Sequence, residues 1–177
     1  MAGRGVAKRY AQAVFDIATE EQAHEQWLGD LSTLASAASD PLGGEFFSAP
    51  NIPQASKRQM LDTLLPGEIR QEVRNLGYML IERRRFEILP DMLEVYRDLM
   101  LDAQGIAIAE VTTAVELTAE EREQVKSQLK SIVGKDIELR THVDPAMIGG
   151  LVARIGDQLI DASVTTQLRH LRSSLTV

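Results

Sequence analysis

The chain has 177 residues, of which 44% are hydrophobic and 25% are charged, and it contains no cysteine. This composition is that of an ordinary globular protein and excludes a disordered chain. The missing cysteine excludes disulfides, thiolate nucleophiles and cysteine-based metal sites, and it fits a reducing compartment. A net charge of −7 argues against a nucleic-acid-binding protein, which normally carries a basic surface.

The chain offers no obvious membrane or export segment. No stretch approaches 18 apolar residues, so we expect no segment that spans a membrane and only an indirect membrane association, through a partner. Residues 1–15 include basic residues but no long apolar run, and Asp16, Glu20 and Glu21 follow directly. We therefore expect mature protein here, and neither a secretory signal nor a transit peptide.

Residues 4–20 predict an amphipathic helix with two neighbouring apolar stripes. One stripe consists of Val6, Tyr10, Ala13, Val14 and Ile17, and the other of Ala7, Ala11, Phe15 and Ala18. Together the stripes are wider than one neighbouring helix usually covers. Either the helix is buried on two sides within its own bundle, or part of this face is a groove for a partner's helix.

Short connections and a helical period continue to about residue 104. Helices are predicted over 22–39, from Pro53 to Leu65, over 68–84 and over 86–103; residues 42–44 are interpreted as a loop, and 45–48 as one short turn. In the second helix, Trp27 is among the residues expected to point inward, whereas His24 is expected on the surface. This part therefore predicts a bundle of about six helices.

The period changes at Gly105. Residues 106–117 alternate as a strand does, and Thr118 with Glu121 forms a capping box for a helix that carries Val125, Leu129 and Ile132 inward. Residues 136–143 predict a second strand and residues 143–163 two more. We therefore expect an α+β protein: a helical domain, 1–104, and a small α/β domain, 105–177, with about four strands and a terminal helix.

The stretch 143–163 is interpreted as structural. Gly149, Gly150 and Gly156 mark turns, Asp161 is expected to accept hydrogen bonds from nearby turn amides, and Ser163 is expected to cap the last helix. Within that helix a narrow seam of the coiled-coil type is formed by Leu168, Leu171 and Leu175. Part of this seam must cover the sheet, and the rest is available to another chain's helix.

No pattern in the chain indicates catalysis. The three histidines lack ligand spacing, and the nucleophile motif Gly-x-Ser-x-Gly and the phosphate loop are both absent. We therefore expect no catalytic residue, metal, cofactor or small-molecule substrate. The run Arg83 to Arg85 joins two helices, and it is interpreted either as a solvated helix end or as a contact for an acidic partner surface.

A resemblance to a known family extends over nearly the whole chain. In the first helix it rests on Ala7, Tyr10, Ala11, Ala13 and Phe15. In the middle it rests on Ser48-Ala49-Pro50 with Lys57, and on Asn75-Leu76 with Arg84. The most specific part is Val143-Asp144-Pro145, Ile148-Gly149-Gly150, Arg154-Ile155-Gly156-Asp157 and Ile160-Asp161-Ala162-Ser163, then Leu168 and Leu171. In order and spacing these motifs resemble the delta subunit of F-type ATP synthase, the OSCP family. Gly77-Tyr78 departs from that pattern, where bulkier aliphatic residues are expected.

The resemblance implies a non-catalytic stator subunit. It would link the catalytic head to the peripheral stalk, so that the head does not turn with the rotor, at the cytoplasmic face of a bacterial plasma membrane. The N-terminal bundle would hold N-terminal helices of the alpha subunits in a groove between the first and fifth helices. Carried over to this chain, that groove consists of Tyr10, Ala13, Val14, Ile17, Leu76, Met79 and Leu80. The C-terminal domain would bind the b subunits of the stalk through Leu168, Leu171 and Leu175.

Two other classes of protein remain as alternatives. One is a small enzyme with a helical lid and an α/β catalytic part, for which the sequence offers only Asp144, Asp157 and Asp161, each beside a turn. The other is a helical adaptor of an unrelated multi-subunit complex.

Overall fold

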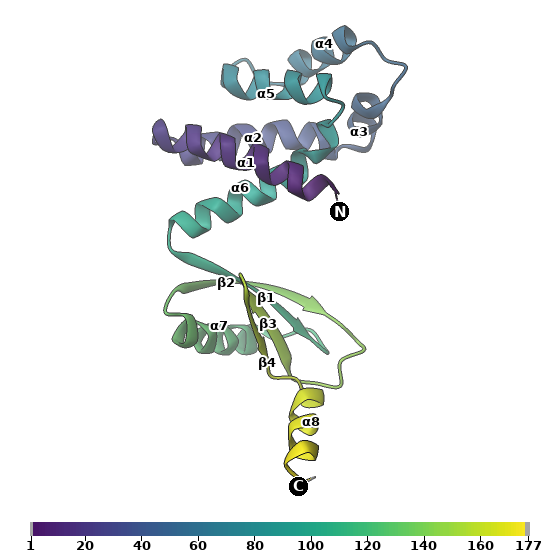
Figure 1. Ribbon diagram of the computed structural model, residues 1–177. Helices are drawn as coiled ribbons and strands as arrows, with labels where there is room; N and C mark the ends of the chain where they lie inside the picture. Colours follow the sequence, from purple (N-terminus) through teal and green to yellow (C-terminus); the bar gives the residue numbers. More distant parts are fainter. Residues whose placement is uncertain (1, 176–177) are drawn as a thin grey trace. The chain divides into compact units, whose positions relative to one another are not determined.

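The computed structural model describes residues 2–175, with side chains described for residues 5–173. The chain forms two compact units, residues 1–100 and 101–177, and each is described by itself (Figure 1). The predicted α+β class is confirmed, because the first unit is helical and the second holds a four-stranded sheet. Of the described residues, none belongs to a helix long and apolar enough to cross a membrane.

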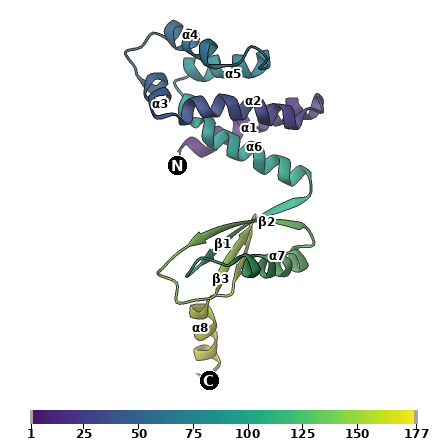
Figure 2. The same cartoon turned by 180° about the vertical axis from the view of Figure 1, so that it is seen from behind.

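The first unit is a bundle centred on its second helix. Its elements are α1 (Ala2–Glu20), α2 (His24–Ser39), α3 (Pro41–Ser48), α4 (Gln54–Leu64), α5 (Gln71–Glu82), a 3-10 turn η1 (Phe86–Ile88) and most of α6 (Leu89–Ala103) (Figure 2). Trp27, Leu31 and Leu34 of α2 are almost completely buried. Helix α2 packs against α1, α3 and α5, so its apolar stripe is the centre of the core.

The interpretation of residues 42–44 as a loop was wrong, because they lie inside α3. The carboxylate of Asp40 accepts a hydrogen bond from the Gly43 amide at 2.9 Å, and Pro41 occupies the first helical position. Asp-Pro therefore ends one helix and begins the next, and an N-cap with buried Phe47 outweighs the low helix propensity of two glycines.

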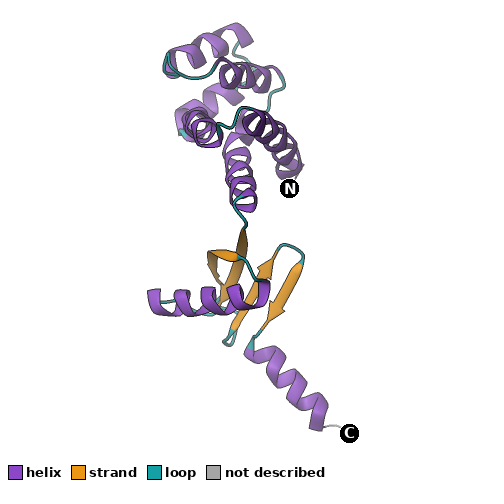
Figure 3. Ribbon diagram, turned by 90° about the vertical axis from the view of Figure 1, so that its left-hand side faces the viewer, coloured by secondary structure: helices purple, strands orange, loops and turns teal. Residues whose placement is uncertain are grey.

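The second unit is a small sheet covered by one helix. It contains β1 (Ile106–Thr113), α7 (Ala119–Val133), β2 (Asp136–Val143), β3 (Leu151–Ile155), β4 (Gln158–Asp161) and α8 (Val164–Leu175). The strand order is β2-β1-β3-β4, with β1 and β2 parallel and the other pairs antiparallel. Helix α7 covers one face of the sheet, and α8 extends away from the sheet's end (Figure 3).

The core of the second unit lies between α7 and the sheet. Ala109 and Val111 of β1 are fully buried there, together with Val125 and Leu129 of α7. The predicted capping box at Thr118 and Glu121 is confirmed, and it fixes the start of α7. Ile132, which was expected to point inward, is 61% exposed, since the buried stripe of α7 continues to Val133 instead.

The first strand is shorter than expected. It ends at Thr113, whose hydroxyl donates to the Val115 carbonyl at 2.7 Å and so turns the chain out of the sheet. Val115 is consequently exposed and lies outside the strand, although the alternating pattern over 106–117 placed it on the same strand face as Val111 and Thr113. The remaining helix starts and ends differ from the predictions by a few residues, as is usual for element boundaries.

Candidate partner-binding surfaces

The two apolar stripes of α1 differ in how far they are buried. Ala7, Ala11 and Ala18 are completely buried, so the alanine stripe packs into the bundle's own core. On the other stripe, Ala13 is exposed and Ile17 is 40% exposed. The bundle therefore covers about half of the wide apolar face, and a narrow strip of α1 remains in contact with solvent.

Helix α5, like α1, carries both buried and exposed apolar side chains. Leu76 and Leu80 are buried, whereas Met79 is 38% exposed. Val14 of α1 belongs to the same hydrophobic cluster as Leu76 and Leu80, and half-buried Tyr10 packs against it. Of the seven predicted groove residues, Val14, Leu76 and Leu80 thus lie in the core, and Ala13, Ile17 and Met79 are accessible.

Gly77 is explained by packing inside the bundle. A Cβ atom at this position would lie 2.6 Å from Leu61 Cδ2 and 3.2 Å from Leu34 Cδ1. The glycine therefore allows α5 to approach α4 and α2 closely, on the side of α5 that faces the core. Position 77, where a bulkier aliphatic residue was expected, thus faces the core, whereas Met79 lies at the surface.

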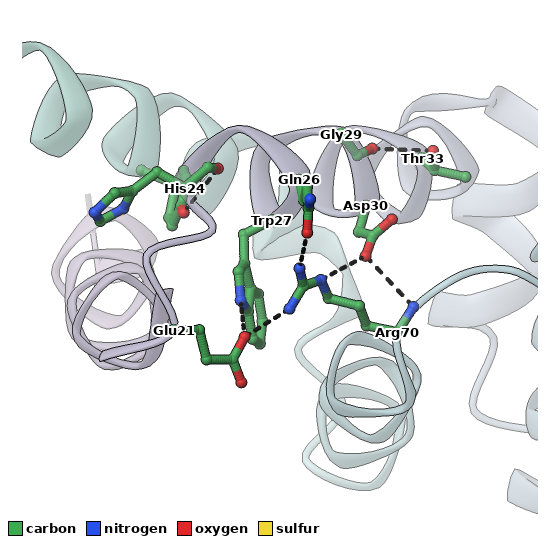
Figure 4. A network of polar contacts seen from close by, with 9 residues as sticks. Glu21, His24, Gln26, Trp27, Gly29, Asp30, Thr33 and Arg70 are labelled. Atoms are coloured by element: carbon green, nitrogen blue, oxygen red, sulfur yellow. Dashed lines mark hydrogen bonds and ion pairs between the residues drawn. The ribbon is translucent and has the colours of Figure 1, made fainter. Parts of the chain in front are cut away.

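A set of polar contacts around Arg70, here called the Arg70 cluster, holds the α4–α5 connection to α2 and to the end of α1 (Figure 4). No sequence pattern indicated it. Arg70 Nη1 lies 2.6 Å from Glu21 Oε2, its Nη2 donates to Gln26, and its Nε lies 3.4 Å from Asp30 Oδ2. The Trp27 indole donates to the same Glu21 oxygen at 2.8 Å. These partners lie 40 or more residues before Arg70 in the chain, so no local motif signals them.

The three histidines do not come together. The prediction that His24 lies on the surface was wrong: it is half-buried and stacks on Phe15, with ring centroids 4.8 Å apart. His142 lies at an exposed position of β2, and His170 lies on α8. Within residues 2–175 no group of three acidic or imidazole side chains is placed to hold a metal ion.

Buried Tyr96 fixes the start of α2. Its hydroxyl donates to the His24 carbonyl at 3.2 Å, and Phe15 packs edge-on against its ring. Burial raises the pKa of Tyr96 to about 12, so the hydroxyl stays protonated, and remains a donor, even in alkaline solution where an exposed phenol ionises. The hydroxyl of Tyr96 therefore has a structural role, since it holds the first residue of α2 in place.

The start of α8 is fixed by two side chains. The Asp161 carboxylate accepts from the Ser163 amide at 2.9 Å and from the Thr166 hydroxyl at 2.8 Å, and Ser163 Oγ accepts from the Thr166 amide at 3.2 Å. The hydrogen-bonding groups of Ser163, and then of Thr166, lower the pKa of Asp161. Both residues anchor the helix to the strand that precedes it.

Glycines at both ends of β3 have positive φ. Gly156 (φ +56) forms the β3–β4 turn, and Gly150 (φ +79) would place a Cβ atom 2.4 Å from the Ala162 carbonyl oxygen. Close to it, the Val164 amide donates to the Gly149 carbonyl at 3.0 Å. Gly149 and Gly150 therefore let the loop before β3 approach the chain at the start of α8.

The surface of α8 is largely uncovered. Leu168 is 54% exposed and Leu171 is 56% exposed. The side chain of Leu175 lies outside the described residues. The prediction that part of this seam covers the sheet was therefore wrong for Leu168 and Leu171, because the helix leads away from the sheet.

The structure contains an apolar groove that was not foreseen. It has a volume of about 570 Å³ and lies among α2, α3 and α4, where Leu42, Phe46, Met60 and Leu64 line it. Leu42 is 79% exposed. Because residues 42–44 were expected to form a loop, no sequence pattern placed these side chains on one surface.

Exposed apolar side chains lie on helices of both units, a feature typical of proteins that bind other proteins. Comparison with known proteins specifies the class. The family described as ATP synthase delta (OSCP) subunit matches residues 6–175. A protein of Symbiobacterium thermophilum, "ATP synthase subunit delta", is 35% identical over 176 residues, which cover 99% of this chain and 95% of that protein. A Dehalococcoides mccartyi protein of the same name is 38% identical over 171 residues, 97% of this chain and 94% of that protein.

A solved structure has the same fold. A chain of the Toxoplasma gondii mitochondrial ATP synthase hexamer matches with a TM-score of 0.67 and 23% identity, over 97% of each chain. This chain belongs to the ATP synthase delta (OSCP) subunit family. Members of the family are non-catalytic, peripheral subunits of the synthase's stator, with the alpha and b subunits as partners, so this chain is a structural subunit and not an enzyme.

Proposed function

We propose that the two units of the chain bind different partners, so that the chain fixes the catalytic head to the peripheral stalk. In this proposal residues 1–104 bind an N-terminal helix of the alpha subunit, and residues 105–177 bind the b subunits. The observation that carries it is the presence of exposed apolar side chains on α1 and α5 in one unit and on α8 in the other. Rotor torque would turn the head with the rotor unless such a bridge resisted it.

On the head side, accessible and buried residues take different roles. Ala13, Ile17 and Met79 would contact the alpha-subunit helix directly, with Tyr10 at the edge. Val14, Leu76 and Leu80 are covered by the bundle and would form the floor that supports them. An amphipathic helix is a suitable occupant, since its apolar face buries such a strip while its polar face stays in water.

On the stalk side, α8 would pair with helices of the b subunits. Leu168 and Leu171 are three residues apart and therefore share one face of the helix, to which Leu175 adds a further position by spacing. Asp161 and Ser163 would act only by fixing the direction in which the helix leaves the sheet.

We also assign the chain to the cytoplasmic face of a bacterial plasma membrane, held there only through the complex. The named relatives from Symbiobacterium thermophilum and Dehalococcoides mccartyi support a bacterial subunit. Fractionation of cells tests this assignment: the chain should sediment with membranes that carry the synthase and be released when the head is stripped off.

Two methionines of nearly equal exposure test the head contact. Met79 is 38% exposed and Met60, on the groove of α2, α3 and α4, is 40% exposed. We expect Met79→Ser to weaken binding of an alpha-subunit N-terminal peptide to the full chain about tenfold, and Met60→Ser to change it less than about twofold. The measurement is isothermal titration. The opposite ranking would move the alpha-subunit site to the α2–α3–α4 groove.

The stalk contact has a matched control of its own. Leu168→Ser and Leu171→Ser should abolish capture of a peptide from the C-terminal end of the b subunits, whereas Leu159→Ser, on exposed β4, should not. All three side chains are more than half exposed, so none of the substitutions should unfold the chain. Retained binding in the Leu168→Ser, Leu171→Ser double variant would contradict the stalk assignment.

A further inference from the structure

Three consecutive arginines occupy the turn between α5 and η1. Arg83, Arg84 and Arg85 are all exposed. Among residues with described side chains, none of the three takes part in a side-chain hydrogen bond or an ion pair. The chain as a whole carries a net charge of −7, so a patch of three unpaired cations is unusual for it.

The backbone of this turn does not require arginine. The amides of Arg83, Arg84 and Arg85 donate to carbonyls in the last turn of α5 at 3.0, 3.1 and 2.9 Å, so backbone groups already close the helix end. Arg84 has φ +54, a left-handed conformation that glycine adopts without strain and that costs another residue about 1 kcal/mol. Neither helix capping nor chain conformation therefore explains the side chain at position 84.

Of the two exposed carboxylates nearest the run in the chain, Glu87 follows Arg85 by two residues, in η1. The other, Glu82, lies directly before the run and is paired with Arg58. Lys57 is buried, and its Nζ donates to the Phe47 and Ala49 carbonyls. Burial, and then the charge of Arg84, lower the pKa of Lys57, which places a fourth basic group close to the turn. The turn thus combines mutual repulsion with backbone strain, and an acidic partner would relieve the repulsion.

The basic turn also adjoins the apolar strip of α5. The Arg83 amide donates to the Met79 carbonyl, so Arg83 follows Met79 by one helical turn on the same face. A helix bound over Met79 would therefore bring its flanking residues to Arg83, Arg84 and Arg85. A guanidinium binds a carboxylate through two parallel hydrogen bonds, which suits Asp and Glu side chains at this place.

We propose that Arg83, Arg84 and Arg85 bind carboxylates in the part of the alpha-subunit segment that flanks its groove-bound helix, and so select and orient that segment. This inference rests on the proposed head contact. A nucleic acid is a poorer partner, because its binding rests on many phosphate contacts to a basic surface, and this chain has a net charge of −7. An anionic membrane is disfavoured as well, since three cations on an acidic chain would attract it only weakly.

The test compares two versions of the alpha-subunit N-terminal peptide, one unchanged and one with every Asp and Glu replaced by Asn and Gln. Each is titrated into the full chain, into the triple variant Arg83→Gln, Arg84→Gln, Arg85→Gln, and into a control with three other exposed arginines replaced (Arg97→Gln, Arg154→Gln, Arg169→Gln). Circular dichroism verifies that every variant is folded.

We expect the triple variant to bind the unchanged peptide about tenfold more weakly than the wild type, and the control variant to bind it within about twofold. The difference should vanish with the neutral peptide and shrink in high salt, where screening shortens the range of charge interactions to about 3 Å at 1 M. Equal affinity of the triple variant and the wild type for the unchanged peptide would overturn the inference.

The remaining outcomes separate this inference from the head contact itself. If Met79→Ser weakens binding but the arginine variant does not, the groove stands and the arginine role fails. If neither peptide binds the wild type, both fail together. Arginine-dependent binding to phosphatidylserine vesicles, without an effect on the peptide, would also overturn the proposed partner.

Discussion

The guanidinium of Arg70 lies over the indole of Trp27, with Arg70 Cζ 5.3 Å from the ring centroid, and both side chains bind Glu21. One residue in the α4–α5 connection thus closes the bundle on the end of α1 and the start of α2. We expect Arg70→Lys to lower the free energy of unfolding by about 1–2 kcal/mol, because lysine cannot form the forked contacts.

Urea unfolding followed by Trp27 fluorescence measures this effect. Trp27 is the only tryptophan and is 1% exposed, so its emission reports on the bundle. The control is Arg97→Lys, at an exposed position of α6, which should change stability by less than about 0.5 kcal/mol. Equal stability of the two variants would show that the Arg70 cluster contributes nothing measurable.

Two helical glycines should respond in opposite directions to alanine. Gly77→Ala places a methyl group 2.6 Å from Leu61 Cδ2 and should destabilise the bundle by about 1 kcal/mol, because overpacking outweighs the gain in helix propensity. Gly29→Ala, in α2 with no atom near the new methyl, should stabilise it by up to about 1 kcal/mol. Thermal unfolding of both variants checks the sign of each change; a stabilised Gly77→Ala variant would refute the close packing of α5.

A second glycine pair tests the loop before β3. Gly150→Ala should destabilise the C-terminal unit by about 3 kcal/mol, since it combines a left-handed φ with a methyl group 2.4 Å from the Ala162 carbonyl oxygen. Gly156→Ala has a left-handed φ but open space and should cost about 1 kcal/mol. Far-ultraviolet circular dichroism in urea provides the comparison, and similar losses in the two variants would mean that the contact at Gly150 relaxes freely.

Acid should weaken the anchor of α8. Ser163 and Thr166 hold the pKa of Asp161 below its usual value, so folding favours the ionised form. The resulting stability is fully present above the unfolded pKa of about 3.9 and is lost as the pH falls through the lower, folded value. The difference in stability between the wild type and Asp161→Asn should therefore be constant above about pH 5 and shrink below about pH 4.

The control for this pH dependence is Asp157→Asn, in the neighbouring β3–β4 turn. Its carboxylate accepts no hydrogen bond among the described side chains, so this substitution should leave the acid profile of the wild type unchanged. The readout is the urea midpoint of the C-terminal unit at a series of pH values. A gap between Asp161→Asn and the wild type that stays constant to about pH 2 would contradict the role of the carboxylate.

Strong local signals predicted most of the architecture. The 3.6-residue period of α1 and the capping box of α7 are local features, so the sequence was sufficient for them. Helix α3 was predicted only in part, as a short turn over residues 45–48, because Gly43 and Gly44 weigh against a helix. The N-cap at Asp40 and the burial of Phe47 in the bundle extend the helix over both glycines.

The candidate surfaces could be predicted only in part. Periodicity showed that α1 is apolar over a wide face, but only tertiary packing decides that Ala11 is covered and Ile17 is not. The same holds for α8: the spacing of Leu168 and Leu171 indicates a seam, whereas its exposure depends on the direction in which the helix leaves β4. Arg70 and its partners are distant in sequence and carry no pattern at all.

Backbone NMR of the full chain shows whether the two binding surfaces are separate. Titration with the alpha-subunit N-terminal peptide should shift amide signals of α1 and α5, foremost Ala13, Ile17 and Met79, and leave Leu168 and Leu171 unchanged. A peptide from the C-terminal end of the b subunits should do the reverse. Shifts of α8 by the alpha-subunit peptide, or no shift in α1 and α5 at saturating peptide, would contradict the assignment of the two partners to separate surfaces.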